Sequence, residues 1–272
     1  GTPVIGWRSE MEQLSRQDAL DWYQHYYAPN NATLIVAGDV DPAKVQAMAE
    51  TWYGPLKPSD GITERARPQE PPQLAERRLS FSDPNISQPY VTRSYLAPER
   101  NSGAQEEAAA LSFLAALLGG NPQTSLLSRA LVFDQKIAIS AGTSYDGTSL
   151  DPTSFTLYVT PAPGVKLADA EAAMDKVIAE LLAKGIDKTQ FTRLKTQLRA
   201  EMIYRKDDVA SLAEDYGSAL TASLTVKDVE AWPDVLQAVT EEDVMKAARA
   251  VFNRHNAVTG WAMTTGAEEV MQ

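Results

Sequence analysis

LSRQDALDWYQHYYAPNNATLIVAGD, residues 14–39, recurs in outline 225 positions later as VTEEDVMKAARAVFNRHNAVTGWAM, residues 239–263. In both stretches a Ser or Thr is followed three positions on by Asp, which is typical of a helix N-terminus closed by a capping box. A helical stretch, a polar turn with Asn and Ala, and an apolar run follow. The pattern predicts two copies of a helix–turn–strand unit, with strands at 33–37 and 257–264. A chance likeness is the alternative, because caps and turns restrict composition anywhere.

If the repeat is real, the chain holds one whole copy and the end of another. Residues 75–272 have room for a complete second copy, and residues 1–56 are predicted to be the C-terminal remnant of a first. Residues 57–74 between them predict an extended linker, because prolines are dense there. These prolines are Pro58, Pro68, Pro71 and Pro72. The rest of the first copy is expected upstream of Gly1.

The second copy alternates strands with a long helical block. Alternating and β-branched residues predict strands at 76–82, 88–96, 137–145 and 154–160, before the final strand at 257–264. Helical patterns cover 102–118, 124–133, 168–183, 188–205, 209–221, 226–238 and 241–252. This order predicts an α+β domain, with a mainly antiparallel sheet and helices packed on one face.

Composition excludes several functions. Lys and Arg number 25 against 36 Asp and Glu, a net charge of -11, so we expect no nucleic-acid partner. The chain has no Cys, which removes thiolate chemistry and Cys-based metal sites. No apolar run approaches the ~20 residues of a membrane span, and the opening residues of the chain lack the basic and apolar regions of a signal peptide.

No stretch supplies a catalytic constellation. His25 and His255 are the two histidines, no zinc-binding histidine motif contains them, and we expect local structural roles for both at helix ends. The GDVDP stretch at 38–42 lacks the glycine and distal Glu of a calcium loop. The GGNP stretch at 119–122 is not followed by the Lys of a phosphate-binding loop, and no Ser stands in a Gly-x-Ser-x-Gly context.

Several segments together resemble the pitrilysin/insulinase family of zinc metallopeptidases, the inverzincins. YYAPNNA at 26–32, running into an apolar strand that ends at Gly38 and Asp39, resembles the close of that family's catalytic domain. WYGPL at 52–56, followed by prolines, is similar to its domain boundary. Residues 126–141 are similar to its helix carrying Ser-Arg-Leu that leads into a strand. The resemblance implies homologous α+β domains that close like a clamshell around a peptide, each a half-clamshell.

In active members the first domain carries His-x-x-Glu-His and a distant Glu. Two His and that Glu hold zinc, and the motif's own Glu activates water. The resemblance places all of them upstream of Gly1, so it implies no catalytic residue, metal ligand or cofactor in this chain. The second domain commonly adds a substrate-contacting Arg and Tyr, seven positions apart. Those positions are Val132 and Ile139 here, and the neighbouring Arg129 and Lys136 do not restore the pair.

The resemblance implies the non-catalytic C-terminal part of a zinc metallopeptidase. Such a part forms the second wall of a peptide-binding chamber, docks on a zinc-bearing domain and is inactive alone. Two alternatives stay open: an inactive partner subunit of a separate active peptidase chain, and a structural subunit like the core proteins of respiratory complexes. A periplasmic or secreted bacterial location is expected from the family's habits.

Overall fold

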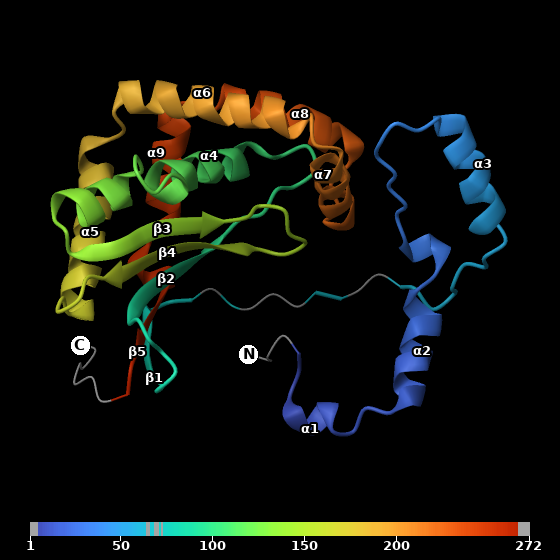
Figure 1. Cartoon of the computed structure of the whole chain (residues 1–272), viewed down its shortest axis with the longest axis horizontal. Coiled ribbons are helices and arrows are strands. Elements are labelled where there is room, and N and C mark those ends of the chain that lie inside the picture. The colour runs from blue at the N-terminus through green and yellow to red at the C-terminus, as the bar shows by residue number, and fades with distance from the viewer. Residues whose placement is uncertain (1–4, 64–65, 68–70, 72, 266–272) are drawn as a thin grey trace. The chain divides into compact units, whose positions relative to one another are not determined.

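The computed structural model describes residues 5–63, 66–67, 71 and 73–265 (Figure 1). It divides into two compact units, Gly1–Glu70 and Pro71–Gln272. Within the predicted linker, Pro68 and Pro72 lie outside the described residues. No helix in the described part of the chain is long and apolar enough to cross a membrane.

The second unit is built on a five-stranded sheet with strand order β1-β5-β2-β4-β3. The strands are β1 (Arg77–Ser82), β2 (Tyr90–Ala97), β3 (Ala138–Tyr145), β4 (Thr153–Pro161) and β5 (Ala257–Met263). β1 pairs with β5 in parallel, and the other three pairs are antiparallel. The chain's last strand therefore lies between two early ones, which joins the two ends of the unit.

Helices cover one face of this sheet (Figure 1). They are α4 (Glu106–Ala115), α5 (Leu167–Lys184), α6 (Lys188–Arg205), α7 (Val209–Thr221), α8 (Val226–Ala238) and α9 (Glu241–Val251). Buried side chains from β2, β4 and β5 meet those of α4, α5 and α9 in one apolar core, for example Leu157, Phe113 and Met174. The predicted α+β fold with helices on one face of a mainly antiparallel sheet is confirmed.

Three of the helices have the bounds that the sequence predicted, and a capping residue marks the start of each. α6, α7 and α8 have the predicted bounds, with Asp187, Asp208 and Thr225 accepting hydrogen bonds from backbone amides of the first turn. α4 instead begins at Glu106, four residues later than predicted. Ser102 Oγ and the Gly103 amide donate to Asp228, and Gly103 has a φ of 73°, so this segment is a loop fixed to α8.

Two π-helical turns replace regular α-helix beside the edge strand β3. They span Ala116–Gly120 and Ser128–Asp134, where the sequence predicted α-helix. Ser128 Oγ donates to the Ala141 carbonyl and Thr143 Oγ1 donates to the Ala115 carbonyl, so side-chain hydrogen bonds connect this edge to the turns. A Cβ on Gly119 would lie 2.2 Å from the Thr143 amide nitrogen. The turns therefore cover an edge that would otherwise be open to pairing.

The first unit contains α1 (Arg8–Met11), α2 (Arg16–Tyr26), a 3₁₀ turn η1 (Pro29–Asn31) and α3 (Pro42–Trp52). α2 and η1 match α9 and the 3₁₀ turn η4 (Arg254–Asn256) at both ends when 225 is added to their residue numbers. Each helix carries the predicted capping box, with the Asp18 and Asp243 amides each 3.2 Å from the capping hydroxyl. The helix and the turn of the predicted unit therefore occur at both positions.

The repeat stops at the strand. Residues 257–263 form β5, but residues 32–37 form no strand, contrary to the prediction of one at 33–37. β5 is hydrogen-bonded to β1 and β2 on its two sides. A strand needs such neighbours because its backbone groups pair only across the ladder. The first unit contains no strand among its described residues, so Leu34, Ile35 and Val36 have nothing to pair with.

Candidate functional site

The sheet of the second unit has an open face opposite its helices. Along β2, Val91, Arg93 and Tyr95 are buried toward the helices, whereas Tyr90 and Leu96 are exposed on the other side. The same alternation follows the neighbouring strands, because paired residues share a face. The open face therefore presents alternate residues of every strand.

Cross-strand pairs define the centre of the open face. One row runs Gly142, Tyr158, Thr92, Gly260 and Leu79 from β3 to β1. The Tyr158 ring fills the space beside Gly142, since a Cβ there would lie 2.5 Å from Tyr158 Oη. In the next row, Ser94 Oγ and Thr156 Oγ1 are 2.9 Å apart and share a hydrogen bond.

The open face combines hydroxyl groups with exposed apolar side chains. Its hydroxyls come from Thr92, Ser94, Thr156 and Tyr158, and its large exposed apolar groups from Leu79, Phe81, Tyr90 and Leu96. Leu96 is 70% exposed. Such a surface can contact an extended peptide through apolar packing and through hydrogen bonds to its backbone.

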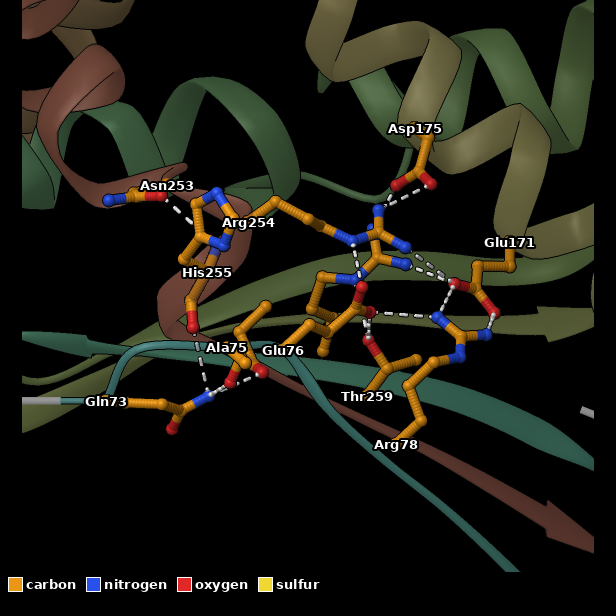
Figure 2. Close-up of polar contacts among 12 residues, drawn as sticks. Gln73, Ala75, Glu76, Arg78, Glu171, Asp175, Asn253, Arg254, His255 and Thr259 are labelled. Carbon is orange, nitrogen blue, oxygen red and sulfur yellow. Dashed lines mark hydrogen bonds and ion pairs between the residues drawn. The ribbon is translucent and has the colours of Figure 1, made fainter. Parts of the chain in front are cut away.

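A buried ion-pair network lies on the opposite, helix-covered side of the sheet. Arg93 of β2 is 1% exposed and pairs with Glu171 and Asp175 of α5. Glu171 also accepts from Arg78 at 2.9 Å and from the Trp261 indole at 2.7 Å. Figure 2 shows Glu76, Arg78, Glu171, Asp175 and Arg254 converging with Thr259. Three guanidinium groups and three carboxylates thus join β1, β2, β5 and α5.

The network keeps Glu171 and Glu76 ionised. Burial alone would raise the pKa of Glu171, but hydrogen bonds from Arg78 and Trp261 and the charge of Arg93 hold it below its usual range. Burial would likewise raise the pKa of Glu76, and hydrogen bonds from Arg254, Arg78 and Thr259 lower it instead. Glu171 and Glu76 are held ionised by guanidinium groups, which suits a structural role for this cluster rather than acid–base catalysis.

The two histidines have the local positions expected of them. His25 lies in the last turn of α2, with its ring against Gly61 and 4.4 Å from the Tyr26 ring. His255 lies in η4, where its amide donates to Asn253 Oδ1 and its carbonyl accepts from Gln73 Nε2 (Figure 2). Within the described ranges, no three His, Asp or Glu side chains are grouped to hold a metal ion. The described residues therefore do not fit a zinc centre.

The two predicted substrate-cavity positions lie in different surroundings. Val132 is in the second π-helical turn, partly buried against the core. Ile139 is 46% exposed at the start of β3, where the register with β4 shifts between Ala138 and Ser140. Neither side chain can donate a hydrogen bond, unlike the Arg and Tyr expected in the family. Their role in a substrate cavity remains a prediction.

The buried network and the composition of the open face were not predicted from the sequence. A signal for Arg93 existed, because it alternates with Val91 and Tyr95 and must share their buried face. Its partner Glu171 is 78 positions away, and no local pattern connects the two. No sequence pattern predicted which residues make up the open face, because that depends on the order of the strands in the sheet.

The fold and the site define a peptidase-like half-clamshell domain without metal ligands among its described residues. Comparison with known families agrees, since the model of the peptidase M16 inactive domain matches residues 13–198. The chain belongs to this family. The resemblance to the inverzincin zinc metallopeptidases drawn from the sequence is therefore confirmed.

Relatives and solved structures carry related names. The zinc protease PqqE of Helicobacter pylori is 29% identical over 222 residues, which cover 78% of this chain and 48% of that protein. A protease from Helicobacter pylori shares the fold with a TM-score of 0.83 at 20% identity, over 95% of this chain and 61% of the other. The periplasmic protease PqqL of Escherichia coli matches with a TM-score of 0.77 at 18% identity, when its first half is compared. That match covers 95% of this chain and 57% of the PqqL half.

A chain from a solved complex also shares this fold. A chain of Complex III2 from Candida albicans matches with a TM-score of 0.75 at 18% identity, over 96% of this chain and 62% of that one. The chain spans about half the length of the curated relatives it matches.

Proposed function

We propose that this chain is the non-catalytic C-terminal part of a zinc metallopeptidase-like protein, and that it forms the second wall of a peptide-binding chamber. The observation that carries the proposal is the open sheet face, with its exposed apolar side chains and row of hydroxyls. A sheet with one face packed and one face exposed is expected where the exposed face binds a ligand or partner. The enzymatic chemistry belongs to a zinc-bearing domain that lies outside this chain.

The exposed apolar side chains of the first unit support docking on that domain. Among its described residues only Ala28 is buried, while its aromatic side chains are exposed, with Trp52 at 74%. Exposed apolar area of this extent is unfavourable by about 25 cal/mol for each Å² left in water. Residues 5–63 therefore belong to a larger packed body, and we infer that a zinc-bearing domain completes it.

The wall proposal is tested with the zinc-bearing part present. Leu96→Ser changes the open face, whereas the matched control Ile203→Ser changes an exposed apolar residue on α6. We expect Leu96→Ser to raise KM for an unstructured peptide several-fold with a smaller change in kcat, because it removes binding rather than chemistry. Ile203→Ser should leave both unchanged. Equal effects of the two variants, or none from either, would contradict the proposal.

Two other assemblies remain candidates. The match to a chain of Complex III2 favours a structural subunit, and the family's inactive domain also suits a partner subunit of a separate active chain. Purification of the parent protein from its own cells separates them. Zinc in the same polypeptide supports the chamber wall, zinc in a co-purifying homologous chain supports the partner subunit, and a respiratory complex supports the structural subunit.

A periplasmic location is proposed from one neighbour. The protease PqqL, which shares the fold, is named as periplasmic. Fractionation of cells that produce the parent protein tests this. Recovery with periplasmic marker proteins supports the proposal, and recovery elsewhere contradicts it.

A further inference from the structure

A pocket of about 470 Å³ lies on the helix-covered side of the second unit, away from the open face. Its walls come from the β3–β4 connection, the α6–α7 turn, α7 and α8. This volume lies within the ~300–1,000 Å³ range of small-ligand pockets. The proposed chamber wall does not use it.

Arg100 supplies a fixed positive charge at this pocket. Its Nε and Nη2 donate to Gln105 Oε1 at 2.9 and 2.7 Å, and its guanidinium carbon lies 4.0 Å from the centre of the Trp232 ring. Gln105 is buried and is held in turn by the Asp228 carbonyl. The side chain is therefore positioned by a neutral amide and an aromatic face.

The charge of Arg100 is less compensated by paired carboxylates than the charge of Arg205. Arg205, also in the pocket wall, makes a bidentate pair with Asp215. Arg100 makes its side-chain hydrogen bonds to Gln105 and, at 3.5 Å, to Thr148. Burial lowers its pKa below the usual value despite nearby carboxylates, which include Asp228, Asp146 and Asp215. A bound anion would offset the cost of keeping this guanidinium out of water.

The rest of the wall restricts what the anion can be. Met202, Leu212 and Tyr216 provide apolar surface for a side chain. Lys206, Asp146 and Glu230 also line the pocket, and together with Arg100 and the Arg205–Asp215 pair they give the wall no net positive charge. This balance favours a monoanion over a dianion such as a phosphate monoester. Pro233 lies inside α8 and has no N–H, so the Val229 carbonyl lacks its regular helical donor at this wall. Val229 is a lining residue, so its carbonyl is the acceptor that the arrangement proposed below assigns to an amide N–H.

We propose that this pocket binds the carboxy-terminal residue of a peptide. In this arrangement Arg100 binds the carboxylate, the Val229 carbonyl accepts the amide N–H, and the apolar wall takes the side chain. The pocket is then a second peptide-recognition site, one that binds a free C-terminus. It lies on the opposite side of the sheet from the proposed chamber wall, and it does not depend on that function.

The test uses the whole 272-residue chain and three small probes. N-acetyl-L-phenylalanine has the carboxylate, N-acetyl-L-phenylalanine amide lacks the charge, and phenyl phosphate is the dianion. We expect the carboxylate to bind at least about tenfold more tightly than its amide, the gain of one charge-assisted hydrogen-bond pair. Binding of the amide with equal affinity, or tighter binding of phenyl phosphate, would overturn the proposal.

Two arginine variants and NMR mapping test whether the ligand binds in this pocket. Arg100→Gln should remove the preference for the carboxylate over the amide, whereas Arg129→Gln, an exposed arginine on the second π-helical turn, should retain it. If Arg100→Gln lowers the thermal midpoint so far that it unfolds, NMR titration of the unaltered chain decides. The Met202 methyl and Trp232 indole signals must then shift with N-acetyl-L-phenylalanine, and shifts confined to other residues would refute the site.

Discussion

Arg93 is the largest of the fully buried side chains, and its environment explains why a charged residue can lie in the core. Glu171 and Asp175 neutralise it, and Thr259 Oγ1 accepts from its Nε at 2.9 Å. A buried charge is tolerated when it is paired and its hydrogen bonds are satisfied. The network joins α5 to three strands, so it orients the helix layer on the sheet that carries the open face.

Glu171→Gln should destabilise the second unit by up to about 3–5 kcal/mol, because it removes the carboxylate that pairs with both Arg93 and Arg78 and leaves only Asp175 as a counter-charge to buried Arg93. Urea unfolding followed by tryptophan fluorescence measures this. Glu180→Gln is the matched control on the same helix, since Glu180 forms an exposed pair with Lys184. An unchanged midpoint for Glu171→Gln would contradict the structural role of the network.

The same residues predict a dependence of stability on pH. Because the folded state lowers the pKa of Glu171 and Glu76 from 4.5, their contribution is complete above that value and is lost as pH falls through the lowered pKa. Thermal midpoints measured from pH 7 to pH 2 should therefore fall below about pH 4.5. The fall should be shallower in Glu171→Gln, and identical curves would contradict the assignment.

Gly119 is a second residue whose identity is fixed by packing. An added Cβ would lie 2.2 Å from the Thr143 amide nitrogen, and backbone atoms cannot move aside as a side chain can. We expect Gly119→Ala to cost about 1–3 kcal/mol. Gly120→Ala is the control, since its Cβ would lie 3.3 Å from the Ala116 Cβ. Equal thermal midpoints for the two variants would contradict the close approach of this turn to β3.

At the scale of elements, the sequence predicts what local chemistry decides. Asp187, Asp208 and Thr225 mark helix starts through side-chain hydrogen bonds to nearby amides, so α6, α7 and α8 were predicted to the residue. Strand pairing is not local, and the order of the five strands could not be read from the chain. The same limit explains the segment at 33–37, whose composition predicts a strand but which has no paired strand among the described residues of the first unit.

Hydrogen exchange tests this account of residues 33–37. In the chain alone their amides should exchange rapidly, whereas those of residues 258–262 in β5 should be protected by pairing on both sides. Addition of the zinc-bearing domain should protect residues 33–37 and leave β5 unchanged. Protection of 33–37 in the isolated chain would show that the segment already has a partner, and would contradict the proposed docking.

At the scale of the whole molecule, the chain divides into units of different character. The second unit has its own core and an open sheet in which the first strand pairs with the last. The first unit has few buried residues. Membership of the peptidase M16 inactive domain family fits both facts, since the matched region runs from the first unit into the second. The sequence indicated this family through the order of its segments and the capping residues of its helices. The buried network and the Arg100 pocket depend on residues that only folding brings together.

Zinc content and peptidase activity of the parent protein that includes residues upstream of Gly1 test the central claim most directly. We predict one zinc ion per parent chain and cleavage of unstructured peptides, with neither property in the 272-residue chain after metal stripping and reloading. Stoichiometric zinc or cleavage by the 272-residue chain would contradict its assignment as a non-catalytic part. A parent without zinc or cleavage would contradict the chamber-wall proposal and make the chain part of an inactive homologue.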